Sequence, residues 1–202
     1  MGFLQEPVVP ARAVQAGADQ WVVSGWTSPD GQAYLAPLLR AVCAPAPPVP
    51  GALQLRLETP EGVRTIPFGP QVVPDLPSGY GHFCFTVPAQ GELVSAEVHS
   101  PGARPCRRLR AHAFAGRTEA LLAGIRTGGT VIRDEGEVLH LEWDSRLHPY
   151  VNVLHEGTRR ATLALHLTGG SADVCLDGLP AGGVFVIHFS DGLNPVVRIV
   201  AR

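Results

Sequence analysis

Four side chains that can bind a metal ion or transfer a proton lie within one short stretch of the sequence: His140, Glu142, His148 and His155. Imidazole is the commonest protein ligand for metal ions, and it is the side chain that titrates closest to neutral pH. His140 and Glu142 are two residues apart, so a strand would place them on one face, and a hairpin would bring His148 and His155 toward them. The spacing therefore allows a metal site, or a hydrolase site built from the same side chains.

Apolar residues alternate with these polar ones. Leu139, Leu141 and Trp143 occupy the positions between and beside His140 and Glu142. A strand with one buried face and one solvent face has this period of two. Outward polar side chains on such a strand are far commoner than metal ligands. We therefore expect Trp143 in a core, the four polar side chains at the surface (His140, Glu142, His148 and His155), and no metal ion.

The stretch from 139 to 155 is organised by this alternation. The first run is followed by a turn, and a second run extends from Tyr150 to Leu154, which predicts a hairpin or a corner between two strands. His166 and His188 lie on later alternating runs and are expected to point outward as well. The residues expected to point inward on those runs are Leu163, Leu165, Phe185 and Ile187.

Arrangements for nucleophilic catalysis are poorly represented. The sequence has no Gly-x-Ser-x-Gly motif. Cys84 and His82 would share the outward face of a strand, but this pair lacks an orienting third group and an oxyanion site. Glu142 and Asp144 would lie about 6.5 to 7 Å apart at Cα, a spacing that permits paired carboxylates without indicating them. We expect no catalytic residue, no cofactor and no enzymatic activity.

Binding of a glycan or another protein is the alternative to chemistry. Trp26 and Tyr80, together with Trp21, could stack on a sugar if they are exposed. Arg107 and Arg108 belong to the one basic cluster of the sequence, which could grip a phosphate or an acidic partner. A solvated linker is the simpler interpretation of that cluster. The candidate ligand-binding residues are therefore Trp26, Tyr80, Arg107 and Arg108.

The composition indicates an all-β protein. The 202 residues include 23 Gly and 19 Pro without a Gly-X-Y period, which favours many tight turns between short strands. A formal net charge of −2 gives no general field for capturing nucleic acid, so no nucleic-acid partner is expected. All 16 basic residues are arginine, so no lysine is present to form a Schiff base or a P-loop contact.

Compartment and redox state stay open. No segment approaches the roughly 18 apolar residues that span a bilayer, so we expect no membrane insertion. The N-terminus lacks a basic region followed by an apolar one, so we also expect no signal peptide. The four cysteines are widely spaced, without a Cys-x-x-Cys pair. Cys84 and Cys175 lie in apolar runs and are expected to be buried thiols, while any disulfide pairing remains unassigned.

Strand spacing predicts two small antiparallel sandwich domains of the immunoglobulin or fibronectin kind. We expect an extended leader over 1–17, a first domain over 18–110, a linker over 111–130 and a second domain over 131–202. One short helix, at 120–125 in the linker, is expected after Thr118 as its N-cap. The expected strands of the first domain are 21–26, 33–42 with Pro37 inside it, 53–58, 63–68, 82–87 and 93–99. Those of the second are 138–144, 150–154, 161–168, 172–176, 184–189 and 196–200.

The second half also carries a series of short motifs. Leu141-Glu142-Trp143-Asp144 is followed by His148-Pro149-Tyr150-Val151 and later by Phe189-Ser190-Asp191-Gly192. This series resembles the closing region of large secreted bacterial zinc metallopeptidase-like proteins. The resemblance extends to the first half through Val23-Ser24-Gly25 and Glu97-Val98-His99-Ser100-Pro101-Gly102.

The resemblance implies an accessory β-rich region of a secreted or periplasmic protein, without catalytic residues of its own. The zinc chemistry itself is not carried over, because His155-Glu156 continues as Gly157-Thr158-Arg159 and no His-Glu-x-x-His helix is present. Without the resemblance, the missing signal peptide would favour the cytoplasm. The leading hypothesis is a non-enzymatic interaction module that binds another protein or a cell-surface component, with the metal or hydrolase site and a carbohydrate-binding module as alternatives.

Overall fold

The computed structural model describes residues 17–74, 77–109 and 130–202, and this part of the chain is built from strands and their connections, without a helix. The all-β prediction is confirmed for these residues. No membrane-spanning helix is found among them. The expected leader, the linker and the short helix at 120–125 lie almost wholly outside the described residues.

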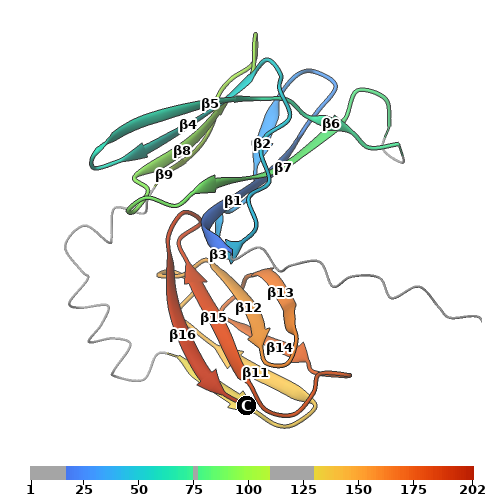
Figure 1. The fold of residues 1–202 in the computed structure, drawn as a ribbon, viewed down its shortest axis with the longest axis vertical. Helices are drawn as coiled ribbons and strands as arrows, with labels where there is room; N and C mark the ends of the chain where they lie inside the picture. Colours follow the sequence, from blue (N-terminus) through green and yellow to red (C-terminus); the bar gives the residue numbers. More distant parts are fainter. Residues whose placement is uncertain (1–16, 75–76, 110–129) are drawn as a thin grey trace, which may run out of the picture.

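Sheet A forms one layer of the N-terminal half (Figure 1). Its strands are β1 (Ala18–Thr27), β2 (Ala33–Leu35), β3 (Leu39–Cys43), β6 (Gln71–Val72) and β7 (Gly81–Pro88), in the order β2-β1-β7-β6 with β3 also beside β1. The single strand expected over 33–42 is divided at Pro37 into β2 and β3. Both pieces pair with β1, and the break falls where proline has no N–H to give to a ladder.

Sheet B is the second layer, and the first hydrophobic core lies between the two sheets. Its strands are β4 (Leu53–Thr59), β5 (Gly62–Phe68), β8 (Ser95–His99) and β9 (Cys106–Leu109), in the order β5-β4-β8-β9. The predicted hairpin of β4 and β5 is confirmed, with Leu53 opposite Phe68. Alternate residues point inward on both sheets, as the period of two requires. The core includes Trp21, Val23, Leu55, Leu57, Phe68, Phe83, Phe85 and Val98.

The C-terminal half contains two more antiparallel sheets. Sheet C has the order β10-β11-β14, and sheet D has the order β13-β12-β15-β16. Their strands are β10 (Val131–Asp134), β11 (Val138–Glu142), β12 (Tyr150–Glu156), β13 (Arg160–Leu167), β14 (Ser171–Cys175), β15 (Val184–Ser190) and β16 (Pro195–Ala201). The six strands expected here are confirmed, and β10 was not predicted.

The stretch from 139 to 155 forms a corner and not a hairpin. β11 belongs to sheet C and β12 to sheet D, so the chain crosses between sheets at residues 143–149. Trp143 is 5% exposed in the second core, as expected, and its indole N–H donates to the carbonyl of His148 at 2.9 Å. This bond satisfies the buried indole donor and fixes the corner.

Four expectations about side chains of the C-terminal half are wrong. His148 and His188 were expected at the surface, but they are 6% and 7% exposed. His155 was placed at the surface, yet it is 1% exposed on the inward face, opposite Phe185. Leu165 was expected to point inward, but it is 48% exposed. The register shifts between β12 and β13 on either side of Val153, and His166 has φ of 54°, which reverses the simple alternation along β13.

The two halves meet at the turn between β15 and β16 (Figure 1). Leu193 in this turn is completely buried and belongs to the core of the N-terminal half. The N–H of Leu38 donates to the carbonyl of Gly192 at 2.9 Å. Asp191 shapes the turn, because its carboxylate accepts the N–H groups of Leu193 and Asn194, both at 2.8 Å. A turn of one half therefore completes the core of the other.

Candidate functional site

The structure separates the four side chains that first suggested a metal site. His140 lies on the outer face of sheet C, where Nδ1 is 2.6 Å from Asp173 Oδ1 and Nε2 is 3.1 Å from Glu142 Oε1. The hydrogen bond to Asp173, followed by that to Glu142, raises the pKa of His140 above its usual value. No group of three or more His, Cys, Asp or Glu side chains in the described ranges is placed to hold a metal ion.

His148 and His155 belong to the interior of the C-terminal half. Nε2 of His155 is 2.9 Å from the carbonyl oxygen of Gly182, and its ring meets Phe185 edge to face. The ring of His148 packs against Phe189, and burial lowers the pKa of His148. His148 and His155 are in or beside sheet D and act as packing residues. His140 and Glu142, in contrast, face solvent from sheet C.

The two arginine candidates have different environments: Arg108 contacts other parts of the fold, and Arg107 is exposed. Nε of Arg108 donates to the carbonyl of Leu35 at 2.9 Å, and its guanidinium lies 5.7 Å from the ring centre of Tyr150. Arg108 thus joins β9 to both β2 and the C-terminal half. Arg107 is exposed and lies opposite Glu97 in the ladder of β8 and β9. Arg108 is therefore engaged within the fold, and of these two candidates only Arg107 is exposed.

The cysteines are all free, and two predictions about them are wrong. Cys84 and Cys175, expected to be buried, are both exposed. Cys84 shares the outer face of β7 with His82, as the alternation predicted. Burial raises the pKa of the half-buried Cys43.

Exposed aromatic side chains gather on the outer face of sheet A. Trp26 is 46% exposed and Tyr34 is 41% exposed, and their rings stack with centroids 5.1 Å apart at an interplanar angle of 17°. The ladder places His82 on the other side of Trp26 and Gln71 beyond it. The outer row of sheet A therefore reads Tyr34, Trp26, His82 and Gln71, and all four side chains are exposed.

Gly25 makes the aromatic pair possible. A Cβ at this position would lie 2.0 Å from the carbonyl oxygen of Tyr34 and 2.5 Å from Cζ of Phe83. Only glycine lets β2 approach β1 this closely while Phe83 fills the core beneath. The sequence W-V-V-S-G-W therefore forms a strand, and its glycine leaves the space that Tyr34 needs beside Trp26.

Tyr80 lies beside this row, at the end of sheet A. It is 37% exposed and lines a shallow hollow of about 310 Å³ together with Thr27 and Gln71. Thr27 follows Trp26 in β1, and Gln71 is the last member of the outer row of sheet A. Two of the predicted ligand residues, Trp26 and Tyr80, are therefore exposed in one region. Trp21, also named as a sugar-stacking candidate, is only 3% exposed.

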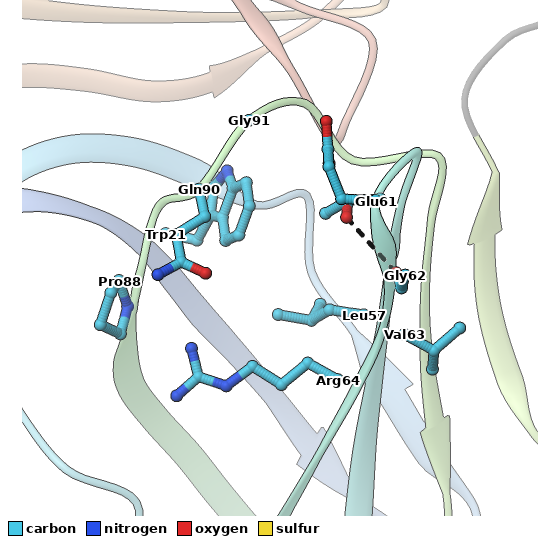
Figure 2. A pocket seen from close by; sticks show the side chains of 10 residues that line it. Trp21, Leu57, Glu61, Gly62, Val63, Arg64, Pro88, Gln90 and Gly91 are labelled. Atoms are coloured by element: carbon cyan, nitrogen blue, oxygen red, sulfur yellow. Dashed lines mark hydrogen bonds between the residues drawn. The ribbon is translucent and has the colours of Figure 1, made fainter.

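A second hollow opens at the opposite end of β1, between sheets A and B. It measures about 440 Å³, and Figure 2 shows Trp21, Leu57, Arg64, Pro88 and Gln90 around it. We call it the edge slot. The β4–β5 turn forms one wall and residues 88–91 form the other. Sequence patterns did not indicate this slot, because the positions that line it are far apart along the chain.

No known protein family, curated protein or solved structure matches the chain. Trp26 and Tyr80 were candidates from the sequence, and both are exposed. Tyr34 was not a candidate, because its three-residue strand is too short for an alternation to be detected. The sequence signal for Tyr34 was Gly25, where the neighbouring strand comes too close for a side chain. This signal can be interpreted only when the pairing of β1 with β2 is known.

Proposed function

We propose that the protein is a non-catalytic binding module of two immunoglobulin-like sandwich domains that attaches to carbohydrate at a cell surface. The binding surface is the outer row of sheet A, with Trp26 and Tyr34 at its centre. The observation that carries this proposal is the stacked and exposed ring pair. If the two rings were buried, packing in a core would explain them. Because they are exposed, contact with a ligand is the explanation that we propose.

Carbohydrate fits the chemistry of the row. The faces of a pyranose present C–H groups that pack on aromatic rings, while its hydroxyl groups need hydrogen-bond partners at the rim. His82 and Gln71 supply polar groups in line with Trp26, at the neighbouring strand positions. Aromatic rings also lose little conformational entropy on binding, because they have only two χ angles.

The rest of the chain supports a binding role more than a catalytic one. Of the polar candidates, His148 and His155 are packed in a core, and Arg108 is engaged with Leu35 and Tyr150. The resemblance to accessory regions of secreted metallopeptidase-like proteins agrees with a module that holds a larger protein at a surface. Such a module would be part of, or would accompany, an exported protein.

Retention on immobilised polysaccharides tests the proposal. The full chain is applied to insoluble β-glucan, chitin and peptidoglycan, and the bound fraction is compared with that of Trp26→Ala and Tyr34→Ala. Truncating an aromatic anchor typically costs about 2 kcal/mol or more, or about 30-fold in affinity. Val42→Ala is the matched control, since Val42 is an exposed apolar residue of the same sheet, 53% exposed. Retention that both aromatic variants keep would reject the proposed surface.

A further inference from the structure

The edge slot lies beside a strand that is paired on one side only. β5 is the terminal strand of sheet B, in the order β5-β4-β8-β9. Pro67 has no N–H for its partner Gln54, so the backbone groups of Pro67, and of Thr65 and Val63 at the same phase, point away from β4. A row of free N–H and C=O groups therefore borders the slot, and such a row can pair with an added strand.

The neighbouring edge of sheet A is already covered. The N–H of Thr86 in β7 donates to the carbonyl of Ala46 at 2.8 Å, and its hydroxyl accepts the Ala46 N–H at 2.8 Å. The Pro-rich segment that contains Ala46 then reaches sheet B, where its Val49 carbonyl accepts the Gly69 N–H at 2.6 Å. Among the described residues no such cover reaches β5 between Val63 and Pro67.

Arg64 brings an exposed positive charge to the slot. It lies on the inward phase of β5, opposite Leu57, and Figure 2 shows its guanidinium extending toward Pro88. Arg64 has no ion pair or hydrogen bond with another described residue, while Glu61 lies at the opposite end of the slot beside Gly91 (Figure 2). The Arg64 end of the slot therefore suits a carboxylate.

The wall of the slot is largely apolar. Trp21, Leu57 and Pro88 supply this surface. The indole N–H of Trp21 is buried and has no hydrogen-bond partner within the described part of the chain, so Trp21 offers its apolar ring and not its N–H to the slot.

We propose that β5 and the edge slot bind an extended acidic peptide segment of a partner protein. The peptide adds a strand to sheet B through the free backbone groups of Val63 and Thr65. Its alternate side chains enter the slot, an apolar one against Trp21 and Leu57 and an Asp or Glu against Arg64. This second surface binds a different ligand from the one proposed for the outer row of sheet A. Peptide binding here does not depend on carbohydrate binding there.

Peptide arrays test this assignment on the full chain. The probes are acetylated and amidated octapeptides that alternate Thr with Val or Leu and carry Asp, Asn or Lys at one inward position. We expect Asp peptides to bind at least tenfold more tightly than the matched Asn peptides. Arg64→Glu should reverse the preference toward Lys peptides, because it reverses the charge at the same place.

The backbone arm of the test uses Thr65. Thr65→Pro removes an outward N–H on the side where Pro67 is already tolerated, and we expect at least a tenfold loss of binding, whereas Thr65→Val should have little effect. Equal binding of Asp, Asn and Lys peptides, no binding of any of them, or binding indifferent to Arg64→Glu would overturn the proposal. The last result would also identify Arg64 as an inward charge that only protects the edge from aggregation. Should Thr65→Pro fail to fold, the charge reversal still decides.

Discussion

Asn194 and Leu93 are joined by two hydrogen bonds across the halves of the molecule. Nδ2 of Asn194 donates to the carbonyl of Leu93 at 2.8 Å, and its Oδ1 accepts the Leu93 N–H at 2.8 Å. Leu193, the preceding residue, is buried in the core of the N-terminal half. These contacts connect the two halves. The sheets A and B that carry the proposed binding surfaces are therefore attached to the C-terminal half.

Leu193→Ala should destabilise the whole protein. Removing a fully buried leucine costs about 2 to 5 kcal/mol, because transfer energy is lost and a cavity remains. Urea unfolding followed by circular dichroism measures the change. Val197→Ala, at a position 46% exposed on β16, is the control and should change the free energy of unfolding by less than about 0.5 kcal/mol. Equal effects of the two variants would mean that the contacts between the two halves are not formed in solution.

Gly25→Ala should separate Tyr34 from Trp26. The added methyl would lie 2.0 Å from the Tyr34 carbonyl oxygen, so β2 must shift away from β1. We expect lower stability together with a changed near-ultraviolet circular dichroism signal from the stacked rings. Ser24→Ala, one position earlier in β1, should preserve both. An unchanged aromatic signal in Gly25→Ala would show that β2 can lie close to β1 without glycine.

Stability should fall as the pH drops below about 6.5. Burial lowers the pKa of His148, His166 and His188 from the ordinary value of 6.5. The unfolded chain then binds more protons than the folded one between the lowered pKa and 6.5, so acid favours unfolding in that window. His140 has a raised pKa and acts in the opposite direction, but its partners Asp173 and Glu142 are exposed, so solvent weakens this effect. Melting temperatures at about pH 7.5 and 5.5 measure the difference, and His188→Asn should reduce it. A higher melting temperature at the lower pH would contradict this sign.

Cys84 provides a chemical test of the outer row. It is exposed on β7, two residues from His82, so a bulky maleimide attached there would stand over the row about 7 Å away at Cα. In a Cys175→Ser background, labelling of Cys84 should block carbohydrate retention. Labelling of Cys175 in a Cys84→Ser background should leave retention intact, since Cys175 lies on sheet C. Equal retention by both labelled proteins would place the ligand elsewhere.

Strand alternation predicted much of the fold, because the period of two is strong wherever one face is buried. It correctly placed Trp143 in a core and paired β4 with β5. It failed at Leu165, where a register shift and a positive φ break the period of β13. At His155 the period holds, because His155 follows Val151 and Val153 on the buried face, and the error was to expect a polar side chain at the surface. It could not distinguish a hairpin from a corner after Trp143, since both have the same local pattern.

The candidate surfaces were less accessible to sequence reasoning. Trp26 was recognised by residue type, but its partner Tyr34 depends on the ladder between β1 and β2. The edge slot depends on how two sheets face each other, which no local pattern records. Arg108 was recognised as a basic residue, yet its role follows from the position of Tyr150, 42 residues away.

Iodide quenching of tryptophan fluorescence tests the carbohydrate proposal most directly. Trp21 and Trp143 are 3% and 5% exposed, so iodide should reach Trp26 almost alone, and Trp26→Ala should abolish most of the quenching. Soluble fragments of the retained polysaccharide should protect Trp26 from iodide at saturation and lower the quenching constant of the intact protein severalfold. Saturating binding that leaves Trp26 as accessible to iodide as before would contradict carbohydrate binding at the outer row of sheet A.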